Sequence, residues 1–316
     1  IRLLQNCIFD KHLGLVQQGF EPLDFRHNPA PELREFQIFR ELYENGTYKS
    51  ADIVGAVSTR FQVKSLLHGD DVRRWIEENP GYDVYVVNPY PHLAYTHKNA
   101  WQRAESIHDP NFPAMTQRVF DLAGLPYDLA NLGHHDNSIL SYCSYWFGNA
   151  TFWQAYMDEV INPVLDLTRD ELGPELHDFL YKHQDYYGVA ATGLGSLPFV
   201  LERTVSLFLA NAPGIKALFY PADRQRIYDC CLFPFEQEIV WLFGDQVDAW
   251  TREGYRGDDM EVYFQMASRM CAAGWLVHFK RHPTDFENGN PRPDMPWFAE
   301  DVPDAIRRGQ RRPIGG

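Results

Sequence analysis

The sequence predicts an α/β fold in which helices flank a mostly parallel sheet, followed by a mostly helical carboxyl-terminal lobe. Apolar runs of strand length alternate with longer amphipathic segments along the first part of the chain. These runs are apolar throughout, which is typical of parallel strands covered on both faces. The chain has 316 residues, of which 45% are hydrophobic and 23% charged, enough for one large globular domain and a smaller lobe.

The amino-terminal part is expected to alternate strands and helices. Strands are predicted at residues 1–9, 52–57 and 83–87, and helices between them at residues 31–43 and 63–78. Right-handed crossovers through such helices give a parallel sheet, and ligands bind at the carboxyl ends of its strands. We therefore expect a binding site where the residues that follow these strands meet.

The rest of the chain is expected to be mostly helical. Helices are predicted at residues 113–123, 150–167, 197–210, 225–242, 246–253 and 258–273, with strands before Gly148 and at residues 275–280. Residues 1–220 are predicted to form the α/β domain. Residues 221–316 are predicted to form the helical lobe, which ends in a basic, loosely ordered tail.

Charge and cysteine content exclude several classes of protein. With 29 Lys and Arg against 43 Asp and Glu, the formal net charge is −14, which disfavours nucleic acid as a partner. The five scattered cysteines include no C-x-x-C pair, so neither a disulfide framework nor a zinc knuckle is expected. No apolar run approaches the ~20 residues that cross a bilayer. We expect a cytoplasmic protein, with at most a peripheral contact between its basic tail and the inner membrane.

Side chains after the predicted strands are suited to bind phosphate. No G-x-G-x-x-G or G-x-x-x-x-G-K-S/T motif follows a strand, which disfavours a dinucleotide oxidoreductase and a P-loop phosphotransferase. Arg60 offers a bidentate fork and Lys64 a point charge for diphosphate oxygens, although either could instead solvate a loop. The candidates for binding a nucleotide diphosphate at this edge are Asp10, Ser58, Arg60, Lys64 and Asn88.

An acid–base pair lies inside a strongly apolar helix. Glu202 and Arg203 are surrounded by leucine, valine and phenylalanine residues, so at least part of the pair must face the interior or a cleft. A buried unpaired charge costs several kcal/mol, so it needs a partner or a ligand. Glu202 could act as a general base for a hydroxyl group, hold a sugar hydroxyl, or form an internal salt bridge with Arg203.

The sequence HHDN contains possible metal ligands at His134, His135 and Asp136. Neighbouring side chains point apart on regular structure, and no H-E-x-x-H or two-histidine, one-carboxylate spacing is present. A metal-dependent hydrolase built on these residues is therefore an alternative with little support.

Several segments resemble bacterial glycosyltransferases of GT-A type that build surface polysaccharides. LPFVLERTVSLFLA resembles a helix of that group in which a Glu-Arg pair follows an aromatic residue. ADIVGAVSTRFQVKS is similar to a strand and loop of the same group, and DVYVVNPYPHLAYTHKNAWQRAESIHDP to the segment that follows it. SYWFGNATFWQAYMDEVINPV resembles a strand and helix on the acceptor side. The likeness covers residues 1–220, and the order of the motifs is its most specific feature.

The resemblance implies a GT-A-like domain that transfers a sugar from a nucleotide-diphosphate donor, a UDP-sugar being expected, to a glycan or lipid-linked acceptor in polysaccharide synthesis. Glu202 or Glu105 would deprotonate the acceptor hydroxyl. The residues implied to bind sugar and acceptor are Asn99, Trp101, Asn149, Trp153 and Arg203. The Asp-x-Asp motif that chelates Mn²⁺ or Mg²⁺ in this group is absent, so no metal ligand set is predicted, although a metal held by Asn88 and one histidine is left open.

A second alternative is a noncatalytic carbohydrate-binding protein that keeps the same fold, because fold alone does not establish activity. That alternative predicts a site rich in tryptophan and tyrosine without a reachable carboxylate.

Overall fold

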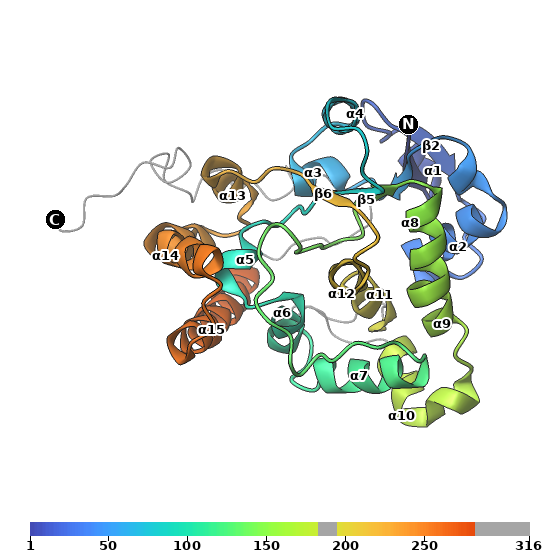
Figure 1. Ribbon diagram of the computed structural model, residues 1–316. Helices are drawn as coiled ribbons and strands as arrows, with labels where there is room; N and C mark the ends of the chain where they lie inside the picture. Colours follow the sequence, from blue (N-terminus) through green and yellow to red (C-terminus); the bar gives the residue numbers. More distant parts are fainter. Residues whose placement is uncertain (183–194, 282–316) are drawn as a thin grey trace.

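The computed structural model describes residues 1–182 and 195–281, and within them a six-stranded sheet forms the centre of the fold (Figure 1). The strands are β1 (Arg2–Cys7), β2 (Glu21–Asp24), β3 (Val54–Val57), β4 (Val84–Val86), β5 (Trp146–Gly148) and β6 (Ala217–Phe219). Their order across the sheet is β2-β1-β3-β5-β4-β6. The predicted α/β class with a mostly parallel sheet is confirmed, and the arrangement is compatible with a Rossmann-like fold.

β5 runs against the other strands of this sheet. It pairs antiparallel with β4, where Val86 is opposite Trp146, and with β3, where Val54 is opposite Gly148. The β1–β2, β1–β3 and β4–β6 pairs are parallel. The carboxyl ends of β1, β3 and β4 therefore meet the amino end of β5 at one edge of the sheet, and Gly148 lies at the opposite edge.

Helices cover both faces of the sheet. They are α1 (Asp10–Leu13), α2 (Glu35–Glu44), α3 (Phe61–Ser65), α4 (Gly69–Glu78), α5 (Leu93–Thr96), α6 (Ala100–Ile107), α7 (Phe112–Leu122), α8 (Ala150–Tyr156), α9 (Asn162–Leu165), α10 (Arg169–Tyr181), α11 (Leu197–Leu201), α12 (Thr204–Asn211), α13 (Arg224–Cys230), α14 (Pro234–Glu253) and α15 (Asp258–Arg281). Shorter turns are the 3-10 turns η1 (Pro31–Leu33) and η2 (Thr47–Lys49) and the π turn η3 (Met157–Ile161).

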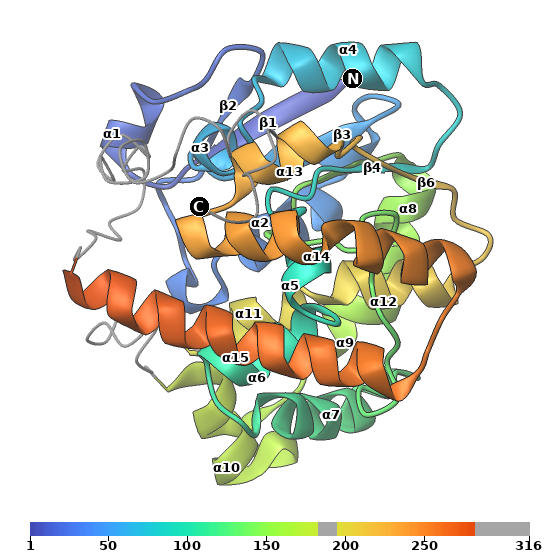
Figure 2. The ribbon, with the colours of Figure 1, turned by 90° about the vertical axis from the view of Figure 1, so that its left-hand side faces the viewer.

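Alternate residues of the central strands point into two apolar layers. Val84 and Val86 pack with α2, α7, α8 and α10 to α12, whereas Tyr85 and Val87 pack with α3 to α5 and α13 to α15. Figure 2 shows α14 and α15 side by side, and both helices contact α5. The helices after residue 220 thus share an apolar core with the sheet.

The helices expected at residues 225–242 and 246–253 have other bounds in the structure: α13 ends at Cys230, and α14 continues without a break from Pro234 to Glu253.

Two predicted helices of the first 220 residues are interrupted. The helix expected at residues 63–78 is divided into α3 and α4, because Leu66 has a φ of 59° and ends α3 in the left-handed conformation. The helix expected at residues 197–210 is divided into α11 and α12 by a turn at Glu202 and Arg203. The second interruption places this acid–base pair at a helix junction.

The strand predicted at residues 275–280 is wrong, because this segment continues α15 to Arg281. Its apolar residues extend a helix that already packs on α5, α6 and α14. The predicted tail lies outside the described residues. Among the helices that the structure describes, none combines the length and apolar character needed to cross a membrane.

Candidate active site

Polar side chains meet at the edge of the sheet where we expect ligands. Ser58 follows β3, and its hydroxyl oxygen lies 3.0 Å from that of Tyr145, which precedes β5. Asn88, beyond β4, accepts the backbone N–H of Tyr90 through Oδ1 at 3.0 Å. The Nδ2 of Asn88 is buried and has no hydrogen-bond partner among the described residues. A buried amide group without a partner costs about 1–3 kcal/mol, so this donor is suited to a ligand.

A cavity of about 100 Å³ lies beside this edge, between β1, β3 and the beginning of α2. Its lining includes Ser58 and Arg60 after β3, and Arg34 and Glu35 where α2 begins. Asn6 of β1 also lines it, and the Oδ1 of this residue is buried without a hydrogen-bond partner in the described part of the chain. Two arginines, a glutamate and an asparagine with an unpartnered amide oxygen thus lie around this small cavity.

Lys64 and Glu202 are far apart in the sequence, and the charge of Lys64 nevertheless acts on Glu202 in the fold. The Nζ of Lys64 donates a hydrogen bond to the Sγ of Cys143 at 3.5 Å. Burial raises the pKa of Cys143 to about 11, which makes it a neutral thiol at pH 7. Burial also raises the pKa of Glu202, and the positive charges of Arg203, Lys64 and Arg103 oppose this rise. The Glu202 side chain is 12% exposed, and its raised proton affinity suits a general base.

Glu35 is a second carboxyl group of this site. Burial, and secondly the negative charge of Glu202, raise the pKa of Glu35 to about 7. Lys64 and Arg34 oppose this rise. Interacting carboxyl groups with raised pKa values are typical of active sites, where one holds a proton while the other is charged.

Arg203 is fully buried and holds Glu202. Its Nη1 donates a hydrogen bond to the Oε1 of Glu202 at 2.8 Å, and its Nε donates to the carbonyl oxygen of Ala100 at 3.2 Å. A second buried arginine, Arg103, shares with Arg203 the hydroxyl oxygen of Tyr142 as an acceptor. These contacts make Arg203 a positioning residue for Glu202, whereas the sequence predicted a substrate-binding role.

Strained backbone lies on both sides of the site. Cys143 and Ser144, next to Lys64, have φ values of 65° and 55°. Arg34, on the wall of the cavity, has a φ of 51°. Residues other than glycine rarely adopt a positive φ, and such backbone strain is concentrated at functional sites.

Two of the predicted residues are exposed. Asp10 begins α1, 90% of its side chain is exposed, and it forms an ion pair with Arg26 at 2.7 Å. Glu105 lies on an exposed position of α6. Neither residue lines the cavity that contains Ser58 and Arg60.

Asn99 and Asn149 form the N-caps of α6 and α8. The Oδ1 of each accepts backbone N–H groups from the first turn of its helix. Asn149 also donates a hydrogen bond to the Oδ1 of Asp83 at 2.8 Å. Because Asn149 follows the antiparallel strand β5, it lies at the edge of the sheet opposite to Ser58. The structure does not bring Asn149 to the cavity.

Trp101 and Trp153 lie in the apolar core. The ring of Trp101 packs against Phe112 and Phe120. The indole N–H of Trp153 donates to the carbonyl oxygen of Val54 at 2.9 Å. Both tryptophans are almost completely buried, which gives them packing roles in this structure.

The ligand atoms of His134, His135 and Asp136 do not form a group that could hold a metal ion. The Nε2 of His134 is 2.8 Å from the carbonyl oxygen of Ala94, and Asp136 accepts hydrogen bonds from Ser138. These contacts give no support to a hydrolase centred on the three residues.

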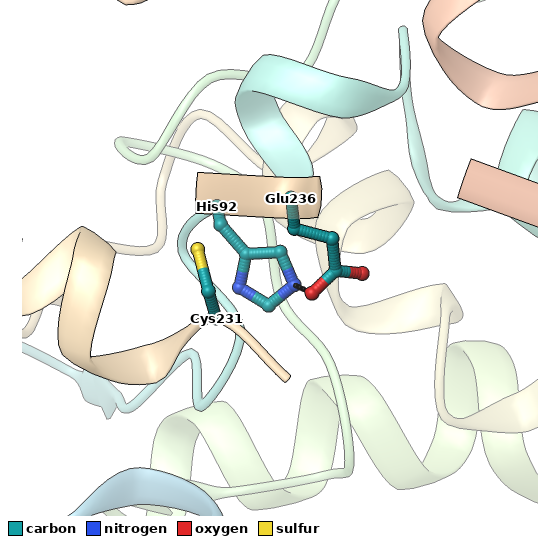
Figure 3. A group of neighbouring side chains, drawn as sticks. All are labelled: His92, Cys231 and Glu236. Carbon is teal, nitrogen blue, oxygen red and sulfur yellow. Dashed lines mark ion pairs between the residues drawn. The ribbon is translucent and has the colours of Figure 1, made fainter. Parts of the chain in front are cut away.

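Among the described residues, one group has ligand atoms close enough together to hold a metal ion. It consists of His92, Cys231 and Glu236 (Figure 3). The Nε2 of His92 lies 3.2 Å from the Oε2 of Glu236, and all three residues are buried. Oε2 also accepts the backbone N–H of Leu232 at 2.8 Å, and Oε1 accepts the indole N–H of Trp275 at 3.0 Å. Because both oxygens already accept hydrogen bonds, we interpret this group as a structural link between α5 and α14.

Sequence patterns gave no indication of several residues around the site. Glu35, Arg34, Tyr142 and Cys143 follow no recognisable motif, and they are brought together by α2 and by the strained turn before β5. An acidic residue at the beginning of a helix is ordinarily explained by the helix dipole. The sequence therefore offered no reason to assign Glu35 a second role.

A second hollow, with a volume of about 550 Å³, lies between α4 and α13. None of the predicted site residues lines it. Comparisons with protein-family models, curated proteins and solved structures find no match for this chain.

Proposed function

We propose that this protein is a glycosyltransferase with a GT-A-like fold that transfers a sugar from a nucleotide-diphosphate donor to a glycan or lipid-linked acceptor. A UDP-sugar is the expected donor, polysaccharide synthesis the expected process, and the cytoplasm, with at most peripheral membrane contact, the expected location. The observation that carries the proposal is the position of Arg60 and Lys64 directly after β3, beside a cavity that Arg60 and Glu35 line.

The arrangement of charges supports this chemistry. Arg60 and Lys64 lie at the carboxyl ends of parallel strands, where a diphosphate would approach, and their positive charges would stabilise the leaving group. Glu202 is a carboxyl group with a raised pKa whose side chain is 12% exposed. A reachable carboxylate is the feature that a noncatalytic carbohydrate-binding protein would not require.

In the proposed reaction, the acceptor hydroxyl oxygen bonds to the anomeric carbon as the bond from that carbon to the diphosphate oxygen breaks. The diphosphate leaves with the electron pair of that bond, and Arg60 and Lys64 offset its charge. Glu202 accepts the proton of the acceptor hydroxyl, while Arg203 keeps the carboxylate in position. This use of Glu202 as a base corresponds to inversion at the anomeric carbon.

The first test is a thermal-shift panel of UDP-, GDP-, CMP- and dTDP-sugars, each with and without Mn²⁺. A ligand that binds the native state raises the melting temperature, so at least one nucleotide sugar should stabilise the protein. The absence of stabilisation by every donor would contradict the proposal.

The second test separates binding from chemistry. Glu202→Gln should bind the donor as wild type does but lose transfer, measured as release of nucleoside diphosphate in the presence of glycan acceptors. Glu253→Gln, an exposed change on α14, is the matched control. If Glu202→Gln retains sugar transfer, Glu202 has a structural role and is not the base.

A further inference from the structure

Glu35 is the one carboxyl group among the described residues that line the cavity beside β1 and β3. It is the first residue of α2, next to Arg34, and Arg60 lies on the same cavity wall. In the described part of the chain, no other side chain donates a hydrogen bond to its carboxyl oxygens, and the group that does so is its own backbone N–H. Its acceptor positions are therefore available to a ligand.

Charged groups outside the cavity lining also act on Glu35. Its pKa responds to the charges of Glu202 and Lys64, which lie outside the cavity lining. The hydroxyl group of Tyr145, which is hydrogen-bonded to Ser58, in turn responds to the charge of Glu35. Glu35 thus lines the cavity and also interacts electrostatically with Glu202 and Lys64.

This position corresponds to one part of a nucleotide-sugar donor. If Arg60 and Lys64 bind the diphosphate and Glu202 receives the acceptor proton, the group that lies between them is the sugar. A carboxyl group can accept hydrogen bonds from two adjacent sugar hydroxyls, and such charge-assisted bonds are stronger than neutral ones.

We propose that Glu35 binds hydroxyl groups of the donor sugar and thereby allows the protein to distinguish a nucleotide sugar from the free nucleoside diphosphate. This inference rests on the proposed function, because it assumes a nucleotide-sugar donor. It adds a sugar-recognition residue that neither the strand-end pattern nor the resemblance indicates.

The experiment compares the affinities of UDP, UDP-glucose, UDP-galactose and UDP-N-acetylglucosamine for the full chain by isothermal titration calorimetry. Wild type should bind at least one UDP-sugar more tightly than UDP. Glu35→Met should lower the affinity for that UDP-sugar about tenfold to a hundredfold, the range expected for losing hydrogen bonds to a charged group. The affinity for UDP should not change. Glu44→Met, at an exposed position of the same helix, should change neither affinity.

Glu35→Gln keeps the size of the side chain and should give a smaller loss, which provides a measurement if the methionine variant does not fold. The inference would be overturned if both variants keep the preference for the UDP-sugar, or if they lose affinity for the UDP-sugar and for UDP equally. Either result would leave the proposed function intact. If wild type binds none of these nucleotides, and none of the GDP, CMP or dTDP counterparts, the proposed function and this inference fail together.

Discussion

Arg203 and Glu202 are adjacent in sequence, and the guanidinium of Arg203 donates a hydrogen bond to the carboxylate of Glu202 at 2.8 Å. The arginine is fully buried, whereas the glutamate retains solvent access. The two residues form the turn between α11 and α12, and their side chains point in different directions from it. One member of the pair is therefore fixed in the interior and orients the other toward the site.

Replacing this buried cation should destabilise the fold. Arg203→Met removes the partner of Glu202 and leaves the carbonyl oxygen of Ala100 without its donor. We expect a loss of about 3–5 kcal/mol in the free energy of unfolding, measured by urea denaturation. Arg118→Met removes an exposed ion pair with Glu175 and should cost at most about 1 kcal/mol. Equal losses in the two variants would contradict the assigned role of Arg203.

Removing the charge of Lys64 should weaken binding of a nucleoside diphosphate. Lys64→Met keeps the length of the side chain but removes the ammonium group near Glu202 and Cys143. We expect UDP affinity to fall about tenfold or more, by calorimetry at low salt, because charge-assisted hydrogen bonds contribute about 1.5–3 kcal/mol. Lys49→Met, an exposed residue before β3, is the control. Unchanged UDP affinity in Lys64→Met would remove Lys64 from the proposed site.

Glu35 should make stability depend on pH. Its pKa is about 7 in the folded protein, against an ordinary value of 4.5, so the folded state binds the proton more tightly than the unfolded state. The cost of ionising it begins above pH 4.5 and is complete above pH 7. Glu35→Gln avoids that cost, so the stability of the variant relative to wild type should be greater at pH 8 than at pH 5.

The measurement is urea denaturation of both proteins at the two pH values. Glu202, Lys64 and Arg34 are the charged groups that influence Glu35, and they are present in both proteins. A stability difference that does not change with pH would show that Glu35 titrates normally.

The link between α5 and α14 should depend on the charge of Glu236. Both of its carboxyl oxygens accept N–H groups, so the amide of Glu236→Gln must turn its own NH₂ toward a donor. It also deprives buried His92 of its charged partner. We expect a loss of about 3 kcal/mol in urea denaturation. Glu253→Gln, at the exposed end of the same helix, should have little effect, and a similar small effect at both positions would contradict this structural role.

The strands and the edge that bears the site could be predicted because long apolar runs are local signals. β1, β3 and β4 lie within the predicted strands. β2 and β6 were not predicted. Both strands are short, and they are the outermost strands of the sheet, where pairing partners rather than composition define a strand. The strand predicted at residues 275–280 failed because a short apolar run does not distinguish a strand from a buried helix.

Prediction of the site had a similar limit. Ser58, Arg60 and Lys64 follow a strand, so their common position could be inferred from chain order alone. Glu35 and Cys143 depend on how distant segments pack, which no local pattern contains. Asn99 and Asn149 were predicted from the resemblance as sugar-binding residues, and in the structure both serve as N-caps.

The antiparallel strand β5 also has a consequence for how the chain is made. β2, β1 and β3 pair with one another, as do β4 and β6, and β5 joins these two halves. A ribosome therefore releases β4 long before the strand that docks it against β3 exists. Both partners of β4 follow it in the chain, so its pairing waits for residues 146–148 and is completed only when residues 217–219 have been made.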